Sequence, residues 1–180
     1  MNYKYEAPIL IEPLIHGDQR GYFFEPYNRE TFRNKWNIDE DFVQDNESFS
    51  RRGVLRGLHY QMEPKAQAKL VRVVLGEVLD VVVDIRKGSQ HFGKVYVYVL
   101  DDKKRDMLFI PRGFAHGFAV LSETAIFQYK VDNFYSKADE RGIIYNDPQL
   151  NIDWRLAATE IQISEKDRVL PSLSDAALFI

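Results

Sequence analysis

The chain of 180 residues contains no cysteine and only four histidines. Without cysteine it has no disulfide, no thiolate nucleophile, no zinc–cysteine site and no iron–sulfur cluster, and it is compatible with a reducing compartment. Long apolar runs are also missing, because charged residues interrupt them before they reach the length of a membrane span. The first residues lack the basic-then-apolar order of a secretory signal. We therefore expect a cytoplasmic protein with no membrane segment.

The chain has no excess of basic residues either. It carries 24 lysines and arginines against 27 aspartates and glutamates, which gives a net charge of -3. Because a general nucleic-acid surface needs a basic excess, we expect no nucleic-acid partner, and any anionic ligand must be met by local cations. Repeats, low-complexity tracts and linkers are absent from the sequence. Residues 1–180 are long enough to bury a core, and we expect them to form a single domain.

Between Lys69 and Val131 apolar residues alternate with a period of two, which is typical of strands with one buried face. The clearest example is residues 78–85, where Leu79, Val81, Val83 and Ile85 share one face and Val78, Asp80, Val82 and Asp84 share the other. Further strands are expected at residues 53–60, 69–75, 95–100, 108–110 and 125–131. Gly76-Glu77 predicts a hairpin between residues 69–75 and the following strand, and the charged residues 101–106 predict a solvated hairpin tip.

Only two segments are predicted to be helical, and both are short: residues 29–36 and 154–159. Many short antiparallel strands with turns between them indicate an all-β sandwich or barrel, and we favour a jelly roll.

The segment Arg56-Gly57-Leu58-His59-Tyr60-Gln61 carries the most concentrated chemistry. The pKa of imidazole suits a general base near neutral pH, so we interpret His59 as a proton-transfer group. A jelly-roll metal site usually needs two histidines that alternate on a strand, but residue 61 is glutamine. The other histidines, His16, His91 and His116, are scattered along the chain. We therefore predict no metal site, since the usual number of ligands is not visible.

Lys69 and Tyr129 each have two interpretations. Lys69 shares its strand face with Val71, Val73 and Leu75, so it is either a solvated surface charge or a cation in a cavity. In a cavity it would stabilise negative charge on a carbonyl oxygen. Tyr129 is either a core residue with a hydrogen-bonded hydroxyl or a general acid. The sequence leaves both alternatives open.

Carboxylates are available to orient both imidazoles. Asp167 is a candidate partner for His59, with a plain surface acid as the alternative. Asp84 is a candidate partner for His116, with a pair to Arg86 or Arg72 as the alternative.

Arg20, Arg56 and Lys166 are candidates for neutralising a diphosphate, since arginine suits bidentate phosphate contacts. Taken singly, each is more often the partner of a surface ion pair.

Taken in order, nine segments of the chain resemble the dTDP-4-dehydrorhamnose 3,5-epimerase family. They are residues 18–23, 42–46, 53–61, 67–73, 76–86, 110–118, 129–130, 146–148 and 164–167. Each segment alone is weakly specific, but together they cover nearly the whole chain. The resemblance implies a cupin-like jelly roll that needs no cofactor and acts on a dTDP-4-keto-6-deoxyhexose in dTDP-rhamnose biosynthesis.

The resemblance also implies roles for individual residues. His59 matches the catalytic base, Asp167 its partner, Tyr129 the proton donor and Lys69 the cation near the enolate oxygen. The positions that match the substrate-binding pocket are Arg20, Glu25, Gln44, Asn46, Arg56, Lys69, His116, Glu140 and Lys166. Among them, Gln44 and Asn46 are expected to hold the thymine.

Three alternatives to this reading remain. Relatives that invert carbon 3 or carbon 5 alone share these residues, so motifs do not separate them from the 3,5-epimerase. A silent sugar-nucleotide binder would lose His59 or Tyr129, and both are present. A metal-dependent cupin would need the histidine spacing that is missing. We also expect a homodimer, since the apolar residues 7–11 could add an edge strand to a partner's sheet.

Overall fold

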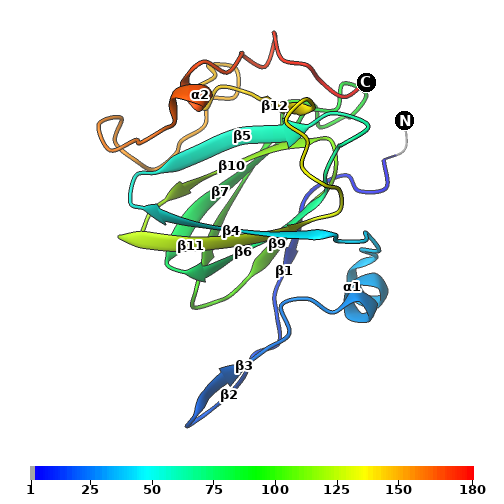
Figure 1. Ribbon diagram of the computed structural model, residues 1–180, viewed down its shortest axis with the longest axis vertical. Coiled ribbons are helices and arrows are strands. Elements are labelled where there is room, and N and C mark those ends of the chain that lie inside the picture. The colour runs from blue at the N-terminus through cyan, green and yellow to red at the C-terminus, as the bar shows by residue number, and fades with distance from the viewer. Residues whose placement is uncertain (1–2) are drawn as a thin grey trace.

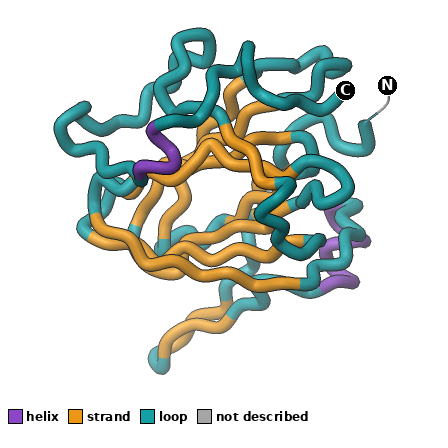
Figure 2. The backbone as a smooth tube through the Cα atoms, turned by 45° about the horizontal axis from the view of Figure 1, so that its top comes forward, coloured by secondary structure: helices purple, strands orange, loops and turns teal. Residues whose placement is uncertain are grey.

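Two five-stranded antiparallel sheets face each other in the computed structural model, which describes residues 3–180 (Figures 1 and 2). Met1 and Asn2, which belong to the N-terminal segment considered above, lie outside the described residues. The first sheet has the order β1 (Ile9–Ile11), β9 (Met107–Ile110), β6 (Lys69–Leu75), β11 (Thr124–Val131) and β4 (Gln44–Arg51). The second has the order β12 (Glu140–Gly142), β5 (Leu55–Gln61), β10 (Phe114–Val120), β7 (Glu77–Asp84) and β8 (Val95–Asp101). The predicted all-β, cupin-like jelly roll is confirmed.

A core of branched and aromatic side chains lies between the two sheets. Val71 and Val73 of β6 meet Val78 and Val82 of β7 there. Phe118 of β10 stacks on Phe127 of β11, with ring centroids 4.2 Å apart. This core occupies one part of the inter-sheet space and supports the polar side chains that lie beside it.

A second core covers the outer face of the second sheet. Leu79, Val81, Val83 and Ile85 pack there against residues of the C-terminal segment that include Trp154, Leu173 and Leu178. The two-face alternation predicted for residues 78–85 is therefore confirmed, and both faces are buried. In Figure 1 the C-terminal loops lie over this sheet. The same segment contains α2 (Glu165–Arg168), which brings Asp167 to the edge of the interior.

A third cluster lies under α1 (Arg29–Trp36), where Phe32 packs with Leu70 and Phe109 of the first sheet. The side chain of Asn28 caps this helix by accepting a hydrogen bond from the Thr31 amide. The predicted helix at residues 29–36 is confirmed.

The helix predicted at residues 154–159 is wrong, because that segment forms bends and turns. Trp154 is buried and donates a hydrogen bond from its indole to the Tyr145 carbonyl, and Arg155 has a left-handed φ of 55°. The apolar pattern there reflects packing of a loop on the second core.

Two predicted hairpins are also wrong. Gly76 joins β6 of the first sheet to β7 of the second, and residues 101–106 join β8 of the second sheet to β9 of the first. Gly76 has φ of +85°, and a Cβ atom there would collide with the Thr124 carbonyl. The pattern of period two predicts strands, but it carries no signal that the chain changes sheets at these turns.

Strand β10 was not predicted. It is buried along its whole length and contains glycine and alanine, so it lacks the alternation of apolar and polar residues that indicates a strand. Strands β2 (His16–Asp18) and β3 (Gly21–Phe23) form a separate two-stranded arm that projects from the body (Figure 1). The apolar N-terminal run contributes β1, which pairs with β9 of its own chain. Both helices of residues 3–180 are too short to span a membrane.

Candidate active site

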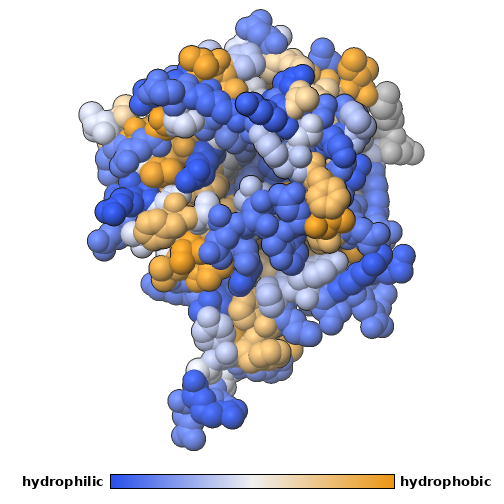
Figure 3. All heavy atoms as spheres, in the orientation of Figure 1, coloured by the Kyte–Doolittle hydropathy of each residue, from blue (hydrophilic) through white to orange (hydrophobic). Residues whose placement is uncertain are grey.

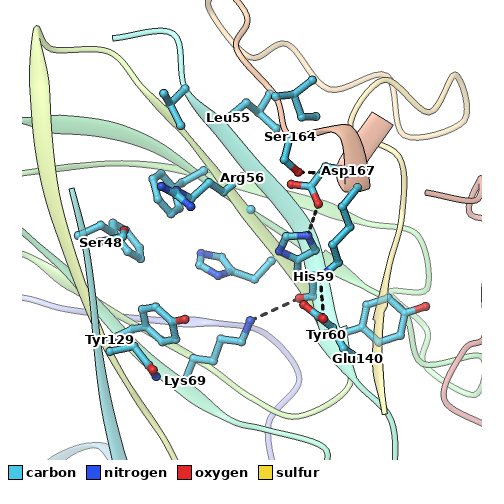
Figure 4. Close-up of a pocket in the computed structure, with 18 of the residues that line it drawn as sticks. Ser48, Leu55, Arg56, His59, Tyr60, Lys69, Tyr129, Glu140, Ser164 and Asp167 are labelled. Atoms are coloured by element: carbon cyan, nitrogen blue, oxygen red, sulfur yellow. Dashed lines mark hydrogen bonds and ion pairs between the residues drawn. The ribbon is translucent and has the colours of Figure 1, made fainter. Parts of the chain in front are cut away.

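A cavity of about 690 Å³ opens between the two sheets beside the inter-sheet core (Figure 4). A volume of this order is typical of sites for small ligands. Nine of the predicted site residues line it: Asn46, Arg56, His59, Lys69, His116, Tyr129, Glu140, Lys166 and Asp167. The remaining three, Arg20, Glu25 and Gln44, are not among the lining residues.

The position of His59 depends on an irregularity in β5. His59 pairs with His116 of β10, whereas Arg56 pairs with Phe118, so three residue steps on β5 match two on β10. An extra residue of this kind is a β-bulge, and it turns Arg56 and His59 toward the same side of the sheet. Gly57 allows it, because its φ is +107° and a Cβ atom would lie 2.5 Å from the His116 carbonyl oxygen.

His59 and Asp167 form a hydrogen-bonded pair at the cavity wall. The distance between His59 Nε2 and Asp167 Oδ1 is 2.7 Å. The Ser164 hydroxyl caps α2 by accepting from the Asp167 amide, and the Gly57 amide donates to Asp167 Oδ2 at 3.5 Å. Burial acts to raise the pKa of Asp167, but the bond and charge of His59 and these backbone contacts hold it below its usual value. Asp167 is therefore ionised and fixes the orientation of the imidazole.

Lys69 enters the cavity from β6 of the first sheet. Its side chain is half-buried, and Nζ donates a hydrogen bond to the His59 carbonyl oxygen at 3.4 Å. Burial lowers the pKa of Lys69 to about 8, although the charges of Asp80 and Glu140 oppose that shift. The structure thus decides between the two alternatives, because Lys69 is a cation in a cavity and not a solvated surface charge.

Tyr129 lies on β11 of the first sheet, opposite the second sheet that carries His59. Figure 4 shows its hydroxyl directed into the cavity on the same side as Lys69. Burial raises the pKa of Tyr129, so the phenol is protonated at neutral pH. It packs against the inter-sheet core and also lines the cavity, so its hydroxyl can donate a proton there.

His116 has its own carboxylate, which is Asp80 of the neighbouring strand β7. The distance between His116 Nε2 and Asp80 Oδ2 is 2.9 Å, and both side chains are buried. Asp84 instead forms a bidentate pair with Arg86, which was the alternative. Which of the two aspartates contacts His116 depends on the register of β10 against β7. In that register Phe118 is opposite Asp80 and Phe114 is opposite Asp84. Since β10 was not predicted, no sequence signal could select Asp80.

Three charged and polar side chains of the cavity lining contact one another. Lys166 Nζ lies 2.6 Å from Glu140 Oε2, and the Tyr135 hydroxyl donates to the same oxygen at 2.9 Å. Burial acts to raise the pKa of Glu140, but these two partners lower it below its usual value. Tyr135 is exposed and was missed, since an isolated tyrosine in a loop carries no sequence signal.

Two more polar contacts shape the side of the cavity that β4 contributes. The guanidinium of Arg56 donates two hydrogen bonds, each 3.2 Å, to the hydroxyl of Ser50. Gln44 lies just outside the lining and donates to Asn46 Oδ1 at 2.8 Å. Arg56 and Asn46 are thus held in place before any ligand binds.

Arg20 and Glu25 lie away from this cavity. Arg20 is at the tip of the β2–β3 arm, where it forms an exposed ion pair with Asp18. Glu25 is exposed in the segment that follows the arm and contacts Asn28. Within one chain, neither side chain joins the other predicted site residues.

The described residues 3–180 contain no group of three or more histidines, aspartates and glutamates placed to hold a metal ion. What the cavity does contain is a histidine of the second sheet paired with a carboxylate of α2, together with a protonated phenol and an ammonium on the first sheet. This arrangement can remove a proton from one face of a bound ring, stabilise the resulting oxyanion and return a proton to the opposite face.

Comparisons with known proteins agree with this chemistry. The model of the dTDP-4-dehydrorhamnose 3,5-epimerase family matches residues 3–175. The dTDP-4-dehydrorhamnose 3,5-epimerase of Shigella flexneri is 50% identical over 179 residues, which cover 98% of each chain.

Solved structures give the same result. The dTDP-4-dehydrorhamnose 3,5-epimerase of Elizabethkingia anophelis is 46% identical with a TM-score of 0.90, and the match covers 97% of this chain and 96% of that one. The dTDP-6-deoxy-D-glucose-3,5-epimerase of Legionella pneumophila, solved in complex with dTDP-4-keto-L-rhamnose, is 45% identical with a TM-score of 0.91. That match covers 97% of this chain and 92% of the other.

Proposed function

Since the chain belongs to the dTDP-4-dehydrorhamnose 3,5-epimerase family, we propose that His59, Tyr129 and Lys69 carry out its reaction. The enzyme is an isomerase of dTDP-rhamnose biosynthesis that converts dTDP-4-dehydro-6-deoxy-D-glucose into dTDP-4-dehydro-L-rhamnose by inverting carbons 3 and 5. The observation that supports the proposed roles most strongly is that a base and an acid enter one cavity from opposite sheets.

The stereochemistry of the substrate matches this geometry. In a D-gluco ring the hydrogens on carbons 3 and 5 are both axial and lie on the same face. A single base on the second sheet, His59, can therefore remove either proton, while Asp167 stabilises the imidazolium that forms. Tyr129 on the first sheet returns a proton to the opposite face, which inverts each centre in turn. One base and one acid therefore suffice for two inversions.

The ketone at carbon 4 makes both protons removable, because either carbanion is delocalised onto its oxygen as an enolate. Lys69, whose Nζ donates to the His59 carbonyl in the cavity, is the cation that stabilises the enolate oxygen. The nucleotide supplies binding contacts remote from the reacting carbons, which hold the sugar in register. Arg56 and Lys166 neutralise the diphosphate, and Asn46 with Gln44 holds the thymine.

The function is tested by proton NMR of dTDP-4-keto-6-deoxyglucose incubated with the protein in deuterium oxide, coupled to a reductase that accepts only the doubly inverted product. We expect deuterium at carbons 3 and 5 together with reductase turnover. Label at a single carbon without turnover would mean that this chain is a mono-epimerase. Absence of any label would contradict epimerase activity on this substrate.

The acid role of Tyr129 has its own test. Tyr129→Phe keeps the ring and its packing against Phe127 but removes the proton donor. We expect deuterium exchange to fall less than epimerisation, by about tenfold in the ratio of the two rates, because His59 still removes and returns protons on its own face. Parallel assays of solvent exchange and coupled turnover measure this ratio. An equal loss in both would contradict the assignment of Tyr129 as the acid.

We also propose that the protein works as a homodimer. Arg20 and Glu25 match pocket positions of the family, but Arg20 lies on the projecting arm and Glu25 follows it. In a dimer the arm of one copy would bring these two residues to the pocket of the other copy. Figure 3 shows a hydrophilic arm tip and apolar atoms gathered where the arm leaves the body. Leu14 and Phe23 are exposed there. Light scattering at the assay concentration should give twice the chain mass of 21.1 kDa, and a monomer would contradict the proposal.

We propose a cytoplasmic location and treat residues 1–180 as one epimerase domain. The lack of cysteine is compatible with a reducing compartment. Cell fractionation with activity in the membrane or secreted fraction would contradict the location.

A further inference from the structure

A buried carboxylate that contacts the cavity-lining residue His116 has no part in the reaction proposed above. Asp80 lies on β7, the strand next to the one that carries His116, and its side chain has 0% exposure. One of its oxygens, Oδ2, is 2.9 Å from His116 Nε2. The other, Oδ1, is the single buried side-chain polar atom of residues 3–180 without a hydrogen-bond partner. A carboxylate buried in this way costs free energy, so its charge is expected to act on its neighbours.

The alternation of the strands directs Asp80 and Lys69 into the same space. Asp80 shares its strand face with Val78 and Val82, and Lys69 shares its face with Val71 and Val73. All four valines belong to the core between the two sheets. Because the effective dielectric constant is lower in such an interior than in water, charges that face it interact more strongly.

The other charged groups around Lys69 and His116 are already partnered or belong to the site. Lys69 is influenced by Asp80 of β7 and by Glu140 of β12, and His116 by Asp80, Lys69 and His59. Glu140 is paired with Lys166 at 2.6 Å. Asp80 has no lysine or arginine within 4.0 Å in the part of the chain that the structure describes. It is therefore the carboxylate whose charge is not neutralised by a nearby ion pair.

We propose that Asp80 is a positioning residue that holds the His116 ring at the cavity wall and keeps Lys69 in its ammonium form during the reaction. In binding to Asp80, neutral His116 uses Nε2 as the donor, so its Nδ1 is an acceptor. The proposal relies on the proposed function only for the role of Lys69 at the enolate oxygen.

The direction of the effect follows from the balance at Lys69. Burial lowers the pKa of Lys69 to about 8, and the negative charge of Asp80 opposes that shift. Without the charge, the pKa falls further and the ammonium is lost at a lower pH. Activity that depends on the ammonium then begins to fall near neutral pH instead of above it.

The test is an NMR titration of Lys69 in the full-length protein labelled with ¹³C-lysine, with the resonance assigned by Lys69→Arg. In Asp80→Asn, which keeps the shape of the side chain, we expect the Lys69 titration to move to lower pH by at least about half a unit. The alkaline limb of the pH profile of kcat/KM should move by the same amount. An unchanged Lys69 titration in folded Asp80→Asn would overturn the proposal.

His116→Gln is the matched control, because it removes the imidazole but leaves the Asp80 charge and a donor that can reach it. Its Lys69 titration should stay at the wild-type pH or move higher. If His116→Gln lowers the titration as much as Asp80→Asn does, disturbed packing is the cause and the proposal is wrong. The Lys69 titration could move in Asp80→Asn while the alkaline limb of the kcat/KM profile does not. That result would support the effect of Asp80 on the Lys69 pKa and would contradict the role proposed for Lys69 at the enolate oxygen. Circular dichroism and thermal melting establish that each variant is folded.

Discussion

The protein contains two histidine–aspartate pairs whose histidines lie on neighbouring strands, and the pairs differ in where the carboxylate comes from. His59 and His116 are directly opposite each other on β5 and β10. The partner of His59 is Asp167, which is 108 residues away in the chain and reaches it from the short helix α2. The partner of His116 is Asp80, which comes from the adjacent strand of the same sheet.

Exposure separates the two pairs further. The side chain of His59 is 29% exposed, whereas that of His116 is 7% exposed. Burial lowers the pKa of His116 despite the opposing charge of Asp80, so its ring is neutral at the pH of the reaction. A base must exchange protons with a ligand and then with solvent, and the more open pair suits that task. The same two residue types thus give a reactive group in one place and a fixed polar wall in the other.

Alanine substitution of the two histidines should give the largest difference between the pairs. His59→Ala should reduce deuterium exchange at both carbons by at least about 10³-fold, because the base for both protons is lost. His116→Ala should reduce it by about 10- to 100-fold, the loss expected of a buried polar contact. Proton NMR of the substrate in deuterium oxide measures both. If His116→Ala were the more severe, the assignment of the base would be reversed.

Much of this comparison could be predicted from the sequence. The alternation of residues 69–75 and 78–85 correctly gave the faces that carry Lys69 and Asp80, because a buried strand face is a local property of period two. Resemblance to the family pointed to Asp167 as the partner of His59, and the contact is present.

Other parts depend on long-range register, which has no local signal. Arg56 and His59 share a face only because of the bulge in β5 against β10. Asp80 and Asp84 share one strand face, and the pairing of β10 decides which of them meets His116. The alternating pattern likewise could not show that β6 and β7 belong to different sheets.

Removing the charge of the distant carboxylate should give the next largest effect. Asp167→Asn should lower kcat by roughly 10²- to 10⁴-fold, because the amide neither stabilises the imidazolium nor fixes the tautomer of His59. Ser164→Ala is the matched control, since it removes the cap of α2 but leaves the bond between Asp167 and His59. The decrease of kcat in Ser164→Ala should be smaller than about tenfold. Steady-state kinetics of the coupled reductase assay compare the two, and equal losses would mean that Asp167 acts only by holding α2.

The smallest expected effect is on stability and involves the buried pair. The pKa of His116 is lower in the folded protein than in the unfolded chain, where it is about 6.5. As the pH falls through that value, the unfolded chain takes up a proton that folded His116 does not, so the free energy of unfolding decreases. The decrease is at most about 1.4 kcal/mol per pH unit for one proton. In urea unfolding between about pH 6.5 and pH 5, His116→Gln should lose this part of the pH dependence. His16→Gln, which removes an exposed histidine, is the control. An identical slope in wild type and His116→Gln would show that burial of the second pair does not hold its imidazole neutral. The two pairs would then differ in exposure and in the origin of their carboxylates, but not in the charge of the imidazole.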